Sequence, residues 1–193
     1  VLLPFLQHFL PFCCLLAAVM ALSMLSGCGS TKNSGDSGDT LLLATTQPMY
    51  ELTQEIIAGA TGITVQALIQ DQVSCLHDYT ITTDQMKKIE RADLVILSGA
   101  GLEDFMSSSL SGKNVADVID SSQGIELLGD DPHIWLGPRR YVQQGENIVE
   151  ALSERYPDQA ELFQQNMQAY EDALLGEYQN NWYPAAQSLS CKE

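Results

Sequence analysis

The chain has 193 residues and a formal net charge of −16, from 9 basic and 25 acidic residues. This length suits one domain of ordinary size, or one domain and the start of another. A chain this acidic repels phosphate backbones, so we expect no nucleic-acid partner. Hydrophobic residues make up 45% of the chain, enough for a core, although the opening segment holds a large share of them.

That opening segment is an apolar run of signal-peptide type. It is interrupted only by Gln7, His8 and Ser23, and by length it could also be a membrane-spanning helix, which is the alternative interpretation. Its last residues, Leu-Ser-Gly before Cys28, resemble the lipobox of bacterial lipoproteins. We therefore expect residues 1–27 to be a lipoprotein signal peptide and Cys28 to carry the lipid. The run has no basic residue before it and begins with valine, so we expect the true N-terminus to lie upstream.

Residues 28–40 are mostly small and polar, which favours a flexible tether. Beyond the tether, short apolar runs alternate with helical patterns. The predicted elements are a strand at 41–46, a helix from Pro48 to near Gly59, a strand at 63–69, a helix capped by Thr83, a strand at 93–97, a short helix through 102–110 and a strand at 115–119.

Strands that alternate with helices and consist of continuous apolar residues indicate an α/β fold, with a parallel sheet covered on both faces. After Pro138 the pattern becomes helical, first over 141–155 and then in a longer helix opened by Pro157. The apolar stripe of this longer helix indicates packing rather than a cofactor site. We expect an α/β lobe over 41–156 and a long helix within 157–193.

Two histidines lie in predicted loops, each beside an acidic residue. His77 precedes Asp78, and His133 follows Asp131 and Pro132. Neutral imidazole is the commonest protein ligand for metals such as zinc, and a nearby carboxylate can fix its tautomer. Ligands of parallel sheets bind beyond the carboxyl ends of the strands, where such loops converge. No short-spacing zinc signature is present, so an ordinary solvated histidine remains the alternative at each position.

Read together, five stretches resemble the solute-binding proteins of zinc and manganese ABC importers. They are Thr45–Tyr50, Leu76–Tyr79, Ala92–Ile96, Gly99–Glu103 and Asp131–Leu136, and their order and spacing fit over the region from Leu41 to Tyr178.

The resemblance implies that His77 and His133 bind Zn²⁺ or Mn²⁺ and that the fold is the N-terminal lobe of a two-lobed protein, followed by a linker helix. It further implies an extracytoplasmic, lipid-anchored protein that delivers metal to an ABC permease. A metal-buffering or adhesin-type surface lipoprotein is an alternative, and a metallohydrolase is a weaker one.

Three departures from the family pattern bear on the site. Leu76 stands where the family usually has proline, and Gly137-Pro138 stands where it usually has Asp-Pro. The family's second lobe supplies a third histidine and a carboxylate, and the chain ends where the linker helix finishes. We therefore expect a truncated form with half of a metal site.

Other residues leave alternatives open. Cys75 and Cys191 could form a disulfide in an exported protein, or remain free thiols. A third alternative makes the Cys75 thiolate a metal ligand, because it is two residues from His77. Glu103 and Asp104 could form an acid pair, but a helix N-terminus also favours carboxylates electrostatically.

Overall fold

The computed structural model describes residues 38–70, 79–110 and 117–184. Within these ranges the centre is a four-stranded, wholly parallel sheet with the strand order β2-β1-β3-β4. The strands are β1 (Thr40–Ala44), β2 (Ile63–Ala67), β3 (Leu94–Leu97) and β4 (Asp117–Asp120). β1 and β3 are the inner strands, and β2 and β4 form the edges. The predicted parallel α/β class is confirmed.

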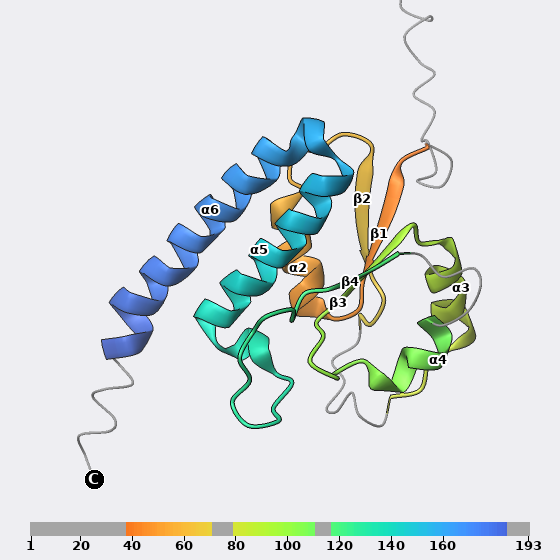
Figure 1. Cartoon of the computed structure of the whole chain (residues 1–193), viewed down its shortest axis with the longest axis horizontal. Helices are drawn as coiled ribbons and strands as arrows, with labels where there is room; N and C mark the ends of the chain where they lie inside the picture. Colours follow the sequence, from red (N-terminus) through yellow and green to blue (C-terminus); the bar gives the residue numbers. More distant parts are fainter. Residues whose placement is uncertain (1–37, 71–78, 111–116, 185–193) are drawn as a thin grey trace, which may run out of the picture. The chain divides into compact units, whose positions relative to one another are not determined.

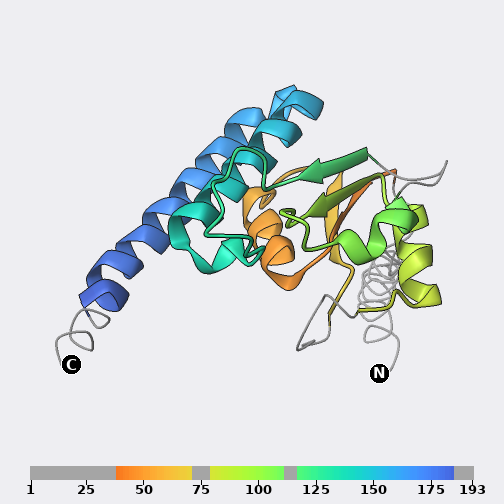
Figure 2. The ribbon, with the colours of Figure 1, turned by 60° about the horizontal axis from the view of Figure 1, so that its bottom comes forward.

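Helices cover both faces of this sheet. One face carries α2, α5 and α6, and the other carries α3 and α4 (Figures 1 and 2). Their bounds are α2 (Gln47–Ile56), α3 (Thr83–Arg91), α4 (Ser107–Leu110), α5 (Pro138–Arg155) and α6 (Ala160–Glu177), which a π-helical turn (Tyr178–Trp182) follows. Across the described ranges, every helix falls short of the combined length and apolarity that a bilayer span requires.

The two layers of helices bury two separate apolar clusters, and successive residues of β1 contribute to opposite ones. Leu42 faces the cluster of α2, α5 and α6, while Leu43 faces the cluster of α3. Both side chains are fully buried. A strand buried on both faces explains why β1 is a continuous apolar run rather than an alternating one.

The α5–α6 pair lies close because α5 has a glycine at the contact. A Cβ added at Gly145 would come within 2.7 Å of Cε of Met167 on α6. Phe163, also on α6, is fully buried in the same cluster. The long helix predicted after Pro157 is therefore part of the core at its start, and α6 then extends away from the sheet (Figure 1).

Three predicted boundaries differ from the structure. Thr82, not Thr83, caps α3, because its hydroxyl accepts the backbone N–H of Gln85 while the Gln85 side chain accepts the N–H of Thr82. α5 begins at Pro138 rather than at 141, since proline suits the first turn of a helix. The expected helix through 102–110 is a 3₁₀ turn (Asp104–Met106) followed by α4. Part of the predicted 115–119 strand lies outside the described residues.

Candidate metal centre

The two predicted metal ligands belong to loops that follow the two edge strands. His77 comes after β2 in the sequence, and His133 comes after β4. β2 and β4 are separated by the inner strands β1 and β3. All four strands are parallel, so their following loops emerge at the same end of the sheet, which is the lower side of Figure 1. The topology thus makes both loops begin at the end where ligands of such sheets bind.

Of the two predicted ligands, His133 lies within the described residues. His77 lies in the segment 71–78, outside the described residues. Cys28, Cys75 and Cys191 also lie outside them, so the predicted lipid attachment and the alternative states of Cys75 and Cys191 stay predictions.

His133 stands at the start of a 3₁₀ turn (Ile134–Leu136) in the loop after β4, with a side chain 43% exposed. Its ring Nδ1 lies 2.6 Å from Oδ1 of Asp131, and its backbone N–H donates to the same oxygen at 3.0 Å. The Trp135 ring packs beside it, with 5.2 Å between ring centroids. The imidazole therefore contacts a carboxylate and an indole, and the first contact is the carboxylate–histidine arrangement that supports metal ligands.

The electrostatics of Asp131 follow from the same contacts. The backbone N–H of His133, and then its ring, lower the pKa of Asp131 below the ordinary value of an aspartate. An ionised Asp131 favours a proton on Nδ1 of His133. Predicted from sequence as a loop histidine beside a carboxylate, His133 is found in that setting.

A buried carboxylate lies at the carboxyl ends of the two inner strands. Glu103 is 5% exposed, and its oxygens accept three hydrogen bonds: from the Thr45 hydroxyl at 2.6 Å, from the Ser98 N–H at 2.8 Å and from the Gly99 N–H at 3.0 Å. Burial raises the pKa of Glu103, these donors oppose that rise, and the charge of Asp120 adds to it. Glu103 thus joins the carboxyl ends of β1 and β3.

The loop that follows β3 has an unusual backbone. Gly99, Ala100 and Gly101 all have positive φ, at 82°, 56° and 80°. The N–H of Ala100 donates to the Ser122 hydroxyl at 2.8 Å, which connects this loop to the residues after β4. The glycine-containing stretch therefore makes a tight turn between neighbouring strand ends.

The acid pair considered for Glu103 and Asp104 is absent from the described structure. Glu103 points into the protein toward Thr45 and two backbone amides, whereas Asp104 is exposed. The neighbouring carboxylates therefore occupy different environments. The sequence pattern alone did not reveal the hydrogen bonds that Glu103 accepts inside the protein.

A second buried polar group was missed in the sequence. The Gln144 side chain of α5 is fully buried and donates to the Ser98 carbonyl and to the Ser121 hydroxyl, both at 2.9 Å. Ser98 and Ser121 directly follow β3 and β4. Two sequence signals could have found this cluster. The first is the polar residue that directly follows each of these apolar strands. The second is the spacing of Gln144, which lies three residues after Tyr141 and four before Ile148 and so falls on the apolar side of the helix.

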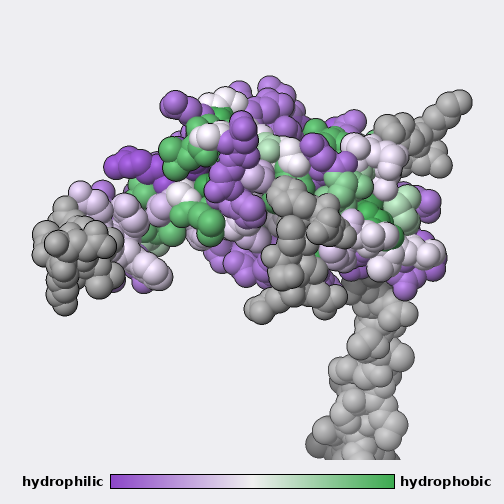
Figure 3. Space-filling model, turned by 90° about the horizontal axis from the view of Figure 1, so that it is seen from below, coloured by the Kyte–Doolittle hydropathy of each residue, from purple (hydrophilic) through white to green (hydrophobic). Residues whose placement is uncertain are grey.

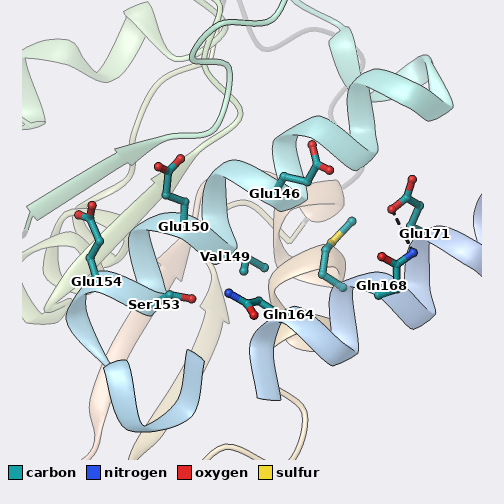
Figure 4. Close-up of a pocket in the computed structure, with 9 residues that line it drawn as sticks. Glu146, Val149, Glu150, Ser153, Glu154, Gln164, Gln168 and Glu171 are labelled. Carbon is teal, nitrogen blue, oxygen red and sulfur yellow. Dashed lines mark hydrogen bonds between the residues drawn. The ribbon is translucent and has the colours of Figure 1, made fainter. Parts of the chain in front are cut away.

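No cluster of three histidine, cysteine, aspartate or glutamate side chains suited to a metal occurs within the ranges the structure describes. The groove between α5 and α6 is acidic, as Figure 4 shows, but its carboxylates lie along two helices and are backed by Val149 and Met167. Its acids are Glu146, Glu150, Glu154 and Glu171. This groove is a solvated helical surface, and the His133 loop remains the candidate metal position.

The face at the carboxyl ends of the strands is seen in Figure 3, which views the molecule from below Figure 1. Among the coloured residues of this face, hydrophilic and hydrophobic side chains are interspersed. Leu136, three residues after His133, is one of the exposed hydrophobic side chains of the described structure.

Curated relatives of the chain are metal-binding proteins of bacteria. The chain is 27% identical over 166 residues to the manganese-binding lipoprotein MntA of Halalkalibacterium halodurans, a match that covers 81% of this chain and 54% of the relative. It is 29% identical over 181 residues to the zinc-binding lipoprotein AdcA of Streptococcus pneumoniae, covering 83% of this chain and 35% of AdcA. The chain thus spans about half the length, or less, of these relatives.

Solved structures show the same fold. The Zn(II)-bound ZnuA-like domain of Streptococcus pneumoniae AdcA matches with a TM-score of 0.64 and 28% identity, covering 72% of this chain and 53% of that one. The metal-dependent lipoprotein YcdH of Bacillus subtilis matches with a TM-score of 0.62 and 28% identity, covering the same shares. The sequence profile of one family matches residues 42–186, well over half of the chain. The chain belongs to that family, which is described as the zinc-uptake complex component A, periplasmic.

Proposed function

We propose that the chain is an extracytoplasmic lipoprotein that captures Zn²⁺ or Mn²⁺ with His77 and His133 and presents it to an ABC permease. The observation that carries this proposal is the His133–Asp131 contact of 2.6 Å, in a loop beyond the carboxyl end of an edge strand. The family match and the names of the zinc-binding and manganese-binding relatives support the choice of metal.

The geometry of His133 defines how it would bind a metal. Asp131 engages Nδ1, so the metal is bound through Nε2 of the same ring. Hydrogen bonding to a carboxylate makes the imidazole a better donor and holds its plane in one direction. A metal competes with a proton for this nitrogen, so affinity falls as the pH falls and imidazole becomes protonated.

The two histidines occupy two positions around the metal. Zinc in proteins usually has four ligands, and manganese takes more, chiefly oxygens. Histidine ligands favour zinc over manganese.

The N-terminal segment supplies the proposed location. We propose that residues 1–27 direct export, that Cys28 carries the lipid and that residues 28–40 link it to the α/β lobe. The names of two relatives, which are both called lipoproteins, support this assignment. β1 begins at Thr40, the last residue of the proposed tether.

Metal titration of the full chain tests the proposal. We expect His77→Ala and His133→Ala each to weaken Zn²⁺ binding at least tenfold, because each removes a proposed metal ligand. Glu90→Ala, at an exposed position of α3, is the control and should bind as the parent chain does. Unchanged zinc and manganese affinities in both site variants would refute the site.

A further inference from the structure

The ligand loops follow the edge strands, so the inner strands determine how far apart those loops begin. The residues after β1 and β3 lie between them. These inner strand ends are joined by Glu103, whose carboxylate receives one hydrogen bond from the end of β1 and two from the residues after β3.

We propose that Glu103 is a positioning residue of the metal site: through Thr45 and Gly99 its three hydrogen bonds fix where the connections that contain His77 and His133 begin, at Ile69 and Ser122. This inference rests on the proposed function. Glu103 binds no metal in this account and acts only through the strand ends that it joins.

Hydrogen bonds continue from Glu103 toward the His77 loop through Thr45. The Thr45 hydroxyl donates to Glu103 at 2.6 Å, and the Thr45 carbonyl accepts the N–H of Ile69 at 3.3 Å. Ile69 follows β2, at the beginning of the connection that contains His77. A shift of Thr45 would therefore move the start of that connection.

Hydrogen bonds also continue from Glu103 toward the His133 loop. The Glu103 carboxylate accepts a hydrogen bond from the N–H of Gly99. The N–H of the following residue, Ala100, donates to the Ser122 hydroxyl at 2.8 Å. Ser122 in turn donates to the Asp120 carboxylate through both its N–H and its hydroxyl, at 2.9 and 2.7 Å. These residues begin the loop that contains His133, so one line of contacts runs from Ile69, after β2, to Ser122, after β4.

The choice of a carboxylate at this place supports a positioning role. An ionised carboxylate loses its hydration when it is buried, and its hydrogen bonds must offset that cost. An apolar side chain would fill the same space without this cost, but it would not hold three donors from two strand ends in one arrangement. A buried carboxylate with directional contacts therefore fits a site whose loops need a defined spacing.

Two pairs of variants separate positioning from simple packing. Glu103→Gln keeps the size of the side chain but replaces one acceptor with an NH₂ group that faces N–H donors. Asp104→Asn makes the same change of charge at the exposed neighbour and is its control. Thr45→Val removes the hydroxyl donor at nearly constant volume, while Thr45→Ser retains a hydroxyl and should restore the parent behaviour.

The test is Zn²⁺ affinity of the full chain together with the visible absorption spectrum of bound Co²⁺, which reports ligand geometry. We expect Glu103→Gln and Thr45→Val to weaken Zn²⁺ binding about 10- to 100-fold, the range for residues that orient metal ligands without contacting the metal, and to alter the Co²⁺ bands at full loading. Asp104→Asn and Thr45→Ser should match the parent chain. Ile148→Val, a buried change in α5, controls for lost stability alone and should also leave both readouts unchanged.

The inference is overturned if both Glu103→Gln and Thr45→Val, as folded chains, bind Zn²⁺ like the parent and give its Co²⁺ spectrum. If Glu103→Gln does not fold, Thr45→Val decides the question by the same criteria. Equal losses of affinity in Ile148→Val would also overturn it, because the effect would then follow stability. The proposed function itself fails only if His77→Ala and His133→Ala bind normally, so the two failures are distinguishable.

Discussion

Replacing Gly99 with alanine would place a methyl group in the tight turn after β3, and two separate costs should follow. The residue has a φ of +82°, where an L-residue with a Cβ is strained. The added Cβ would also overlap Oδ1 of Asp120 and Oγ of Ser122 and come within 2.7 Å of Cβ of Ser122. The neighbouring residues would have to move.

The magnitude follows from these two costs. Positive φ costs an alanine about 1–2 kcal/mol. Moving Ser122 disturbs its hydrogen bonds with Ala100 and Asp120, and a typical hydrogen bond contributes about 0.5–1.5 kcal/mol. We therefore expect Gly99→Ala to lower the free energy of unfolding by about 2–5 kcal/mol.

Gly59→Ala is the matched control. Gly59 has nearly the same φ, +80°, but a Cβ added there would meet nothing within 4 Å. It should cost only the backbone strain of about 1–2 kcal/mol. Urea unfolding followed by circular dichroism measures both variants. Equal losses at the two glycines would refute the tight packing of the loop after β3 against Asp120 and Ser122.

Three further predictions concern ligand support, pH and capping. Asp131→Ala should weaken Zn²⁺ binding about 10- to 100-fold, because His133 loses its orienting carboxylate, and unchanged affinity by calorimetry would contradict this. The pKa of Glu103 is higher in the folded than in the unfolded chain, so its contribution to stability is complete below the unfolded pKa and is lost as the pH rises through the folded pKa. The parent chain should then lose unfolding free energy relative to Glu103→Gln as the pH rises above about 4.5, and parallel pH profiles would exclude that shift. Thr82→Ala should cost about 1 kcal/mol in urea unfolding through the lost cap of α3, whereas Thr83→Ala should not; the reverse order would restore Thr83 as the cap.

The sheet was predictable because its strands are buried on both faces. The apolar run that contains Leu42 and Leu43 has no polar residue to expose, so a parallel, doubly covered strand is the arrangement that suits it. Helix ends were less predictable, since Thr82 and Thr83 are chemically identical neighbours. Only the partner three residues after Thr82, Gln85, distinguishes them.

The surroundings of His133 were predictable from the sequence, its role as a metal ligand stays a prediction, and the contacts of Glu103 were not predictable. His133 and Asp131 form a local pattern with one residue between them, and the structure places them in contact. Glu103 could not be assigned this way, because its hydroxyl partner Thr45 is 58 residues away and its other donors are backbone amides that carry no sequence signature. Contacts across strand ends depend on the order of strands in the sheet.

X-ray absorption at the zinc edge of the metal-loaded chain tests the central claim most directly. We predict two histidine nitrogens at about 2.0–2.1 Å from zinc, with the remaining scattering from oxygen. Loss of either His77 or His133 to alanine should remove one of these nitrogens. A spectrum that neither substitution changes would contradict the site, and a sulfur neighbour at about 2.3 Å would identify a cysteine thiolate as a ligand instead.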